Sequence, residues 1–174
     1  DGHQRLDGEE SVVYHNHSPL PLNFVWFQLD QNRFRPDSDD NVTDDSSSFG
    51  GNLSFKNLNN LLTLPEFKGG YNITKVTDGD GNPLRYSEVR TMMRVDLPTP
   101  LAPGEQTTFQ IQWNHNIVDA KRIHARGGFE FFKDDGNYVY EIAQWYPRVA
   151  AYTDVNGWQH KQFLGNGEFT LEFG

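Results

Sequence analysis

The chain has 174 residues and no cysteine, and its 24 acidic against 15 basic side chains give a formal net charge of −9. A chain of this length suits one domain with a self-supporting core, while the lack of cysteine excludes disulfide scaffolds, thiol catalysis and cysteine-ligated zinc. The acidic balance disfavours non-specific nucleic-acid binding, which needs a basic face, and no apolar run approaches the ~20 residues of a transmembrane helix. We therefore expect one domain over residues 1–174, with no nucleic-acid partner and no membrane span.

The acidity is concentrated near the N-terminus. Residues 1–51 hold ten acids and three bases, a net charge of −7, whereas residues 52–174 hold fourteen acids and twelve bases, a net charge of −2. The densest part is Arg35–Gly51 (RPDSDDNVTDDSSSFGG), where Asp, Ser and Gly leave almost nothing to bury and cannot offset the entropy of ordering. We predict an acidic mobile loop over residues 35–51.

Most of the remaining chain has the periodicity of β-strands. Apolar and polar residues alternate in Thr108–Trp113, which is typical of a half-buried antiparallel strand. Helical spacing occurs only in Asn52–Leu62, just before Pro65, so we expect at most one short helix. The other predicted strands, in chain order, are Ser11–Asn16, Phe24–Leu29, Tyr71–Val76, Met92–Leu97, Gly128–Phe132, Tyr138–Ala143 and Glu168–Phe173.

Turn signals separate these strands. Asp78–Asn82 (DGDGN), Asp135-Gly136 and Asn156-Gly157 are hairpin signals, because Asp, Asn and Gly tolerate positive φ. Pro98–Gly104 (PTPLAPG) predicts a rigid turn, which would make the strands before and after it neighbours in one sheet. Many short strands between such turns predict an all-β fold, a sandwich or a curved antiparallel sheet.

Two patterns raise the question of a metal site. His15 and His17 share one face of a predicted strand, but no third ligand stands near them, so solvent-facing histidines are the favoured interpretation. Asp78–Asn82 matches the first ligands of a calcium loop, but Pro83 stands where that loop needs Gly, so a hairpin turn is favoured. We predict no metal site in this chain.

Two further patterns would suit carbohydrate chemistry. Glu130 and Glu141 flank the predicted Asp135-Gly136 hairpin, and paired carboxylates on facing strands cleave glycosidic bonds in β-sandwich glycosidases. Ordinary strand carboxylates are the favoured interpretation of Glu130 and Glu141. The aromatic residues that could line a sugar-binding platform are Trp145, Tyr146, Tyr152 and Trp158. A place in the core is the favoured interpretation of these aromatic residues.

The C-terminal stretch Glu141–Gly174 (EIAQWYPRVAAYTDVNGWQHKQFLGNGEFTLEFG) carries a family resemblance. It resembles the N-terminal β-domain of the gluzincin aminopeptidases, the family of membrane alanyl aminopeptidase and leukotriene hydrolase-like zinc metallopeptidases, and in particular its bacterial branch. Members have an Arg, an aromatic or Pro-rich strand, an Asp turn and an apolar alternating strand. The matching positions are Arg148, Tyr152, Asp154 and Phe169–Phe173, with earlier matches in Tyr14–Pro19, Phe24–Asn32 and Leu97–Gly104.

The resemblance implies a saddle-like, largely antiparallel β-domain that walls one side of an active-site cleft. The partner would be a downstream thermolysin-like catalytic domain of the same polypeptide, and zinc would belong to that domain. Residues 1–174 contain no His-Glu-x-x-His motif, so this chain alone is not expected to hydrolyse peptides. We expect a fragment of a longer metallopeptidase with a periplasmic or secreted location.

The resemblance also implies a substrate-binding residue. In this family a Gln or Glu of the β-domain holds the amino terminus of the peptide substrate, and here the position matches Gln144, with Glu141 as a possible substitute. A framework glutamine on a strand is the alternative for Gln144. Arg148 is expected to brace the turn through Asp154, because opposite charges close in sequence commonly pair. The rival function is a carbohydrate-binding or adhesion module.

Overall fold

The computed structural model describes residues 4–38, 67–123 and 125–159. The described residues form antiparallel sheets and one short 3-10 helix, so the predicted all-β fold is confirmed. The predicted helix Asn52–Leu62, the strand Glu168–Phe173 and most of the loop 35–51 lie outside the described residues. The elements are β1 Arg5–His15, β2 Leu22–Gln28, the 3-10 helix η1 Asp30–Phe34, β3 Asn72–Asp78, β4 Tyr86–Val89, β5 Met92–Leu101, β6 Gln106–Asn116, β7 Gly128–Phe132, β8 Asn137–Glu141, β9 Arg148–Val149, β10 Ala151–Thr153 and β11 Gly157–Gln159.

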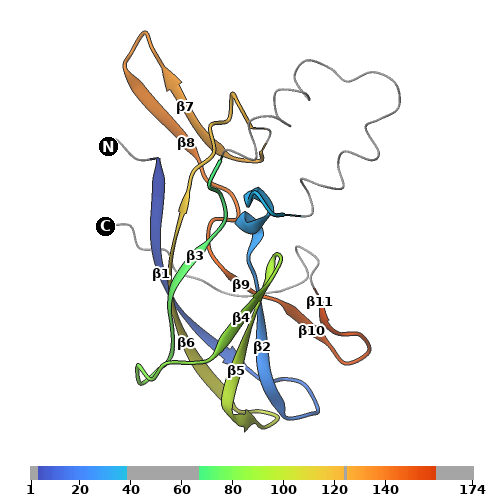
Figure 1. The fold of residues 1–174 in the computed structure, drawn as a ribbon. Helices are drawn as coiled ribbons and strands as arrows, with labels where there is room; N and C mark the ends of the chain where they lie inside the picture. The colour runs from blue at the N-terminus through green and yellow to red at the C-terminus, as the bar shows by residue number, and fades with distance from the viewer. Residues whose placement is uncertain (1–3, 39–66, 124, 160–174) are drawn as a thin grey trace, which may run out of the picture.

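Two sheets form the body of the domain (Figure 1). One has the strand order β1-β6-β3 and the other β4-β5-β2-β9. Strands β1 and β6 pair along their full length, from Arg5↔Asn116 to His15↔Gln106. The long strand β6 therefore lies at the centre of its sheet, and its C-terminal end leads toward the candidate site described below.

The main core lies between these two sheets. The rings of Phe27 on β2 and Phe109 on β6 meet edge to face, with their centroids 5.3 Å apart, and both side chains are completely buried. Burial of each such side chain contributes about 1.5–3 kcal/mol. Further members of this core cluster are Val25, Leu29, Tyr71, Ile73, Val76, Met93, Val95, Ile111 and Trp113.

The prediction that strands 92–97 and 108–113 are neighbours is wrong, because β5 and β6 belong to different sheets. The Pro-rich stretch does not end β5, which continues to Leu101. Pro98 and Pro100 lie opposite the register shift between Leu22 and Phe24 on β2, where no regular ladder hydrogen bond requires their missing N–H groups. The turn follows at residues 102–105 and carries the chain from one sheet to the other.

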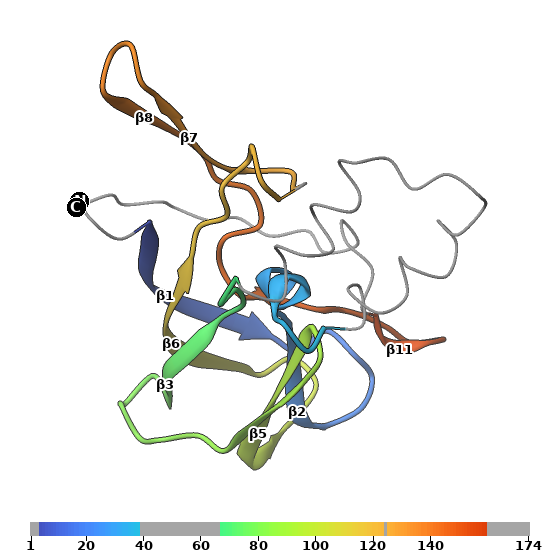
Figure 2. The same cartoon turned by 45° about the horizontal axis from the view of Figure 1, so that its top comes forward.

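The three short hairpin signals are all turns in the structure. Gly136 lies in the turn between β7 and β8, and Gly157 begins β11 directly after the turn that follows β10. Both glycines have φ 66°. In the third turn the Asp78 carboxylate accepts hydrogen bonds from the backbone N–H groups of Asp80 and Asn82, at 3.0 and 2.8 Å. Figure 2 shows the β7–β8 hairpin extending away from the two main sheets.

Strand β8 ends at Glu141, two residues before the predicted boundary. The chain then crosses residues 142–147 as a loop before it enters β9 beside β2. Gln31 on η1 donates hydrogen bonds from Nε2 to the carbonyl groups of Ala143 and Gln144, at 3.0 and 3.1 Å. The first turn after β2 and the loop after β8 are therefore held together although about 110 residues separate them.

Candidate functional site

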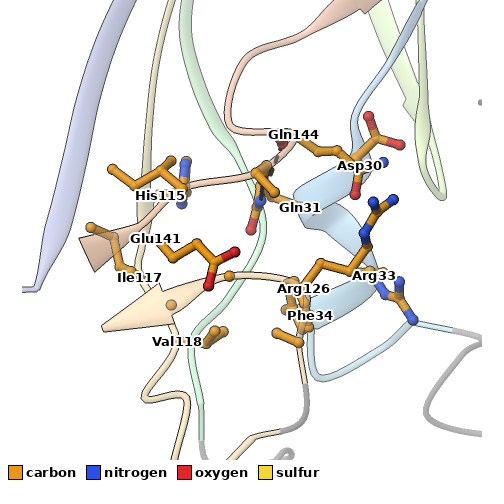
Figure 3. A pocket seen from close by; sticks show the side chains of 15 residues that line it. Asp30, Gln31, Arg33, Phe34, His115, Ile117, Val118, Arg126, Glu141 and Gln144 are labelled. Carbon is orange, nitrogen blue, oxygen red and sulfur yellow. Dashed lines mark hydrogen bonds between the residues drawn. The ribbon is translucent and has the colours of Figure 1, made fainter. Parts of the chain in front are cut away.

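A small pocket lies where η1, the end of β6 and the loop after β8 meet. In Figure 3, His115 and Ile117 lie on one side of the pocket, Asp30 and Arg33 lie on the other, and Glu141 lies between them. Its free volume is about 30 Å³, which is room for a group the size of one or two water molecules. The pocket therefore suits the head of a ligand and not a whole amino-acid residue.

Both predicted substrate-binding residues line this pocket. Glu141 is the exposed last residue of β8, and Gln144 lies in the loop that follows. Gly127 allows the chain to pass closely here, because a Cβ atom at this position would lie 2.4 Å from the Glu141 carbonyl oxygen. The structure thus brings Glu141 and Gln144 together, and their role in binding stays a prediction.

Gln144 has an unusual backbone conformation. Its φ of 53° lies in the left-handed region, which costs a non-glycine residue on the order of 1–3 kcal/mol and persists only where the surroundings enforce it. Two donors hold its carbonyl oxygen: the Tyr71 hydroxyl at 3.1 Å and Gln31 Nε2 at 3.1 Å. Such enforced strain concentrates at binding and catalytic sites, which favours a functional over a framework role for Gln144.

The side chain of Gln144 is incompletely satisfied. Its Nε2 atom is buried and has no hydrogen-bond partner among the described residues. A buried polar atom without a partner costs about 1–3 kcal/mol, so such a group usually meets a ligand or ordered water. The amide therefore presents hydrogen-bonding capacity to the pocket that the surrounding protein does not use.

Tyr71 contacts two residues of the pocket, Gln144 and His115, although nothing in its local sequence marks it as a site residue. Only 2% of its surface is exposed, and its backbone N–H donates to Asn32 Oδ1 at 2.8 Å. Burial raises the pKa of its hydroxyl well above the ordinary value, and the negative charges of Asp30 and Glu10 act in the same direction. The hydroxyl therefore remains protonated and donates to Gln144 at any ordinary pH.

Arg148 does not pair with Asp154 as predicted. It donates to Asp30 Oδ2 from Nη2 at 2.8 Å and from Nε at 3.1 Å, and to Gln28 Oε1 at 2.8 Å. The register places Arg148 opposite Gln28, next to η1, whereas Asp154 lies in the exposed turn between β10 and β11. The ion pair therefore links the start of β9, directly after the loop 142–147, to η1. This is a long-range contact that the local sequence does not reveal.

The aromatic residues considered for a sugar platform do not form one exposed surface. Trp145, Tyr146 and Trp158 are partly buried and pack against the main core, and Trp113 Nε1 donates to the Trp145 carbonyl at 3.2 Å. Trp158 packs beside Tyr152, with ring centroids 5.3 Å apart. The core interpretation, which the aromatic density favours, agrees with these contacts.

The two carboxylates considered for glycoside cleavage lie on the projecting hairpin. Glu130 is paired with Lys121, whose Nζ lies 3.8 Å from Glu130 Oε2, and 42% of its side chain is exposed. Glu141 is also exposed. The general acid of a glycosidase needs a site that raises its pKa, and this hairpin does not enclose either carboxylate.

Within residues 4–38, 67–123 and 125–159, no group of three or more His, Cys, Asp or Glu side chains gathers in an arrangement that could hold a metal ion. The rings of His15 and His17 are 6.1 Å apart and form only a pair. The Asp78 carboxylate is occupied by its turn, in which Asn82 donates to it from both backbone and side chain.

Within the part of the chain that the structure describes, no helix is both long enough and apolar enough to span a membrane.

Comparisons with known proteins gave a structural likeness only. No protein-family model matches the sequence, and no curated protein matches it significantly. Among solved structures, the chain is similar to an M1 zinc metallopeptidase from Deinococcus radiodurans, with 14% identity and a TM-score of 0.41 over 74% of this chain. A mutant of that enzyme, alone and bound to a Tyr-Ser-Ala substrate, gives the same values. The chain spans about 20% of the length of those proteins.

Proposed function

We propose that this chain is the non-catalytic N-terminal domain of a zinc aminopeptidase-like metallopeptidase. In this role it forms one wall of the active-site cleft, and Gln144 receives the amino terminus of a peptide substrate. The observation that carries the proposal is the left-handed backbone of Gln144, held by Tyr71 and Gln31, within the stretch whose sequence resembles that family.

The chemistry of the pocket suits an amino terminus. A primary ammonium group has N–H donors and no acceptor, so it needs several oxygen or nitrogen acceptors around it. The carboxylate of Glu141 is of this kind, and so is the amide oxygen of Gln144 once a half-turn of the amide exchanges it with the unpartnered Nε2; both residues line the pocket. A free volume of about 30 Å³ admits the ammonium head while the rest of the peptide stays outside.

The remaining parts of the reaction belong to the proposed downstream thermolysin-like domain. Zinc bound there would lower the pKa of a water molecule and polarise the peptide carbonyl. The present chain would contribute position, because a ligand held by its amino terminus presents its first peptide bond at a fixed distance. We do not propose that residues 1–174 hydrolyse peptides by themselves.

The test uses the native parent polypeptide. We expect aminopeptidase activity that chelation abolishes and zinc restores, and we expect Gln144→Leu to lower kcat/KM about tenfold or more, chiefly through KM. Gln106→Leu, which replaces an exposed glutamine at the start of β6, is the matched control and should change neither constant. A parent that ends near Gly174 and has no peptidase activity would reject the proposal.

One observation favours the carbohydrate-binding alternative, at residues other than those predicted. The β7–β8 register places Phe129, Phe131, Tyr138 and Tyr140 on one face of the projecting hairpin, and the last three are 38–45% exposed. Exposed aromatic faces can stack on sugar rings. Saturable binding of oligosaccharides that Tyr138→Ala removes would support this alternative, and no response to a glycan series would exclude it.

A further inference from the structure

His115 lines the same pocket as Gln144 and is almost completely buried. It is the penultimate residue of β6 with 4% exposure, and its ring packs edge to face on Tyr71 with centroids 5.4 Å apart. Its Nδ1 atom lies 3.2 Å from the Asn116 carbonyl, a contact that requires the proton on Nδ1. The Nε2 atom therefore has a free lone pair, and it has no hydrogen-bond partner among the described residues.

The imidazole is an acceptor at neutral pH. Burial lowers its pKa, and the nearby carbonyl oxygens of Asn116 and Trp145 oppose this only in part. The carbonyl oxygen of Trp145, which accepts a hydrogen bond from Trp113 Nε1 at 3.2 Å, also acts on the ring and raises its pKa. It is a second acceptor beside the ring, so a ligand that donates hydrogen bonds suits this end of the pocket better than one that accepts them.

Charged side chains also line the pocket. Asp30 is engaged by Arg148, and Arg33, Arg126 and Glu141 also line the pocket. These lining groups are two acids and two bases, and Arg148 adds a third base against Asp30, so the net charge does not select a cation here. The selectivity then depends on the acceptor atoms that converge on the pocket.

We propose that His115 Nε2 is a second acceptor for the amino group that Gln144 receives, which makes the pocket selective for a primary ammonium. This inference rests on the proposed function and adds a specificity-determining residue to it. Rotation of the Gln144 amide by half a turn places its oxygen where the unpartnered Nε2 atom lies, so that the amide can accept from the same ligand. A methylated or acetylated amine has fewer N–H donors, so it satisfies fewer of these acceptors.

The test measures binding to the full chain of 174 residues. The probe is trialanine amide with a free amino terminus, compared with its N-acetyl and N,N-dimethyl forms. The side-chain 15N resonances of His115 are followed by NMR during titration, because acceptance of a hydrogen bond at Nε2 shifts that resonance selectively. Only the free-amine probe should produce a saturable shift.

Three variants separate the contributions. His115→Phe keeps the ring on Tyr71 but removes the acceptor, and we expect Kd to rise about tenfold. Gln144→Leu should weaken binding at least as much. His15→Phe, at an exposed histidine of β1, is the control and should leave Kd unchanged. Unfolding is measured for each variant, and if His115→Phe does not fold, the His115 resonance of the unmodified chain decides the question.

The outcomes distinguish this inference from the proposed function. Binding of the free-amine probe, weakened by both Gln144→Leu and His115→Phe, supports both. Binding that Gln144→Leu weakens while His115→Phe and the His115 resonance stay unaffected overturns the role of His115 alone. Equal binding of the dimethyl probe overturns the selectivity, and no binding of any probe overturns amino-terminus recognition and this inference together.

Discussion

The Tyr71 hydroxyl lies 3.1 Å from the carbonyl oxygen of Gln144 and donates a hydrogen bond to it, while the ring of the same tyrosine packs edge to face on His115. One buried side chain thus fixes both groups that have unused hydrogen-bonding capacity at the pocket. It reaches them from the residue just before β3, an element that contains neither group. The site is therefore assembled by the core and not by the loop that carries Gln144.

Tyr71→Phe tests this arrangement. The substitution removes one hydrogen bond to the Gln144 carbonyl but keeps the ring on His115, so we expect a loss of about 1 kcal/mol in the free energy of unfolding. Chemical denaturation measures the loss. Tyr138→Phe, at a ring that is 45% exposed, is the control and should change stability little. Equal stability of the Tyr71 variant and the unmodified chain would show that the hydroxyl does not hold the loop.

Gln144→Gly tests whether strain is stored at the site. Glycine adopts positive φ without steric cost, so the variant should be more stable by up to about 1 kcal/mol, while it loses the amide that faces the pocket. Arg90→Gly, at the other non-glycine residue with positive φ among the described ones (54°), is the comparison for relief of backbone strain at a position that does not line the pocket. A destabilised Gln144→Gly protein would mean that side-chain contacts outweigh the backbone strain.

The local features of the fold could be predicted from sequence. Strand β7 has the predicted bounds Gly128–Phe132, and the turns at Gly136 and Gly157 occur where Asp-Gly and Asn-Gly stand. These features depend on alternation and on residues that tolerate positive φ, both of which are properties of neighbouring residues. They do not determine which strands share a sheet, so the predicted pairing of the strands around Pro98–Gly104 was wrong.

The site could be predicted only in part, for the same physical reason. Gln144 and Glu141 stand three residues apart, and the structure places both at one pocket. His115 lines that pocket from the end of β6 and Gln31 lines it from η1, while Tyr71 contacts Gln144 and His115 from outside the pocket. Nothing in their local sequence marks these three residues. The Arg148–Asp30 pair likewise joins residues 118 positions apart, whereas the sequence favoured a nearby acid.

The Arg148–Asp30 ion pair should contribute more than the exposed pairs. Its side chains are 23% and 12% exposed, whereas those of Arg94 and Asp96 are 41% and 35% exposed. We expect Arg148→Met to cost about 1–3 kcal/mol, because it removes the guanidinium that pairs with the partly buried Asp30 carboxylate. Arg94→Met should cost at most about 1 kcal/mol. Double-mutant cycles in urea measure both coupling energies, and equal values for the two pairs would contradict the prediction.

Glu10 should make stability depend on pH. It lies on the inner face of β1, where burial raises its pKa from 4.5 to about 8, and its Oε1 atom has no partner among the described residues. Between these two pKa values the folded state holds a proton that the unfolded state has released. The free energy of unfolding should therefore fall by roughly 1.4 kcal/mol per pH unit over this range and level off above it.

Glu10→Gln removes the titrating group and nearly preserves its shape. The variant should lose this pH-dependent decrease and be more stable than the unmodified chain at pH 8, because no carboxylate has to ionise in a buried position. Glu9→Gln, at the exposed neighbour on the opposite face of β1, is the matched control and should keep the decrease. Urea unfolding at pH values from 5 to 9 measures all three proteins, and a decrease that persists in Glu10→Gln would assign the effect to another group.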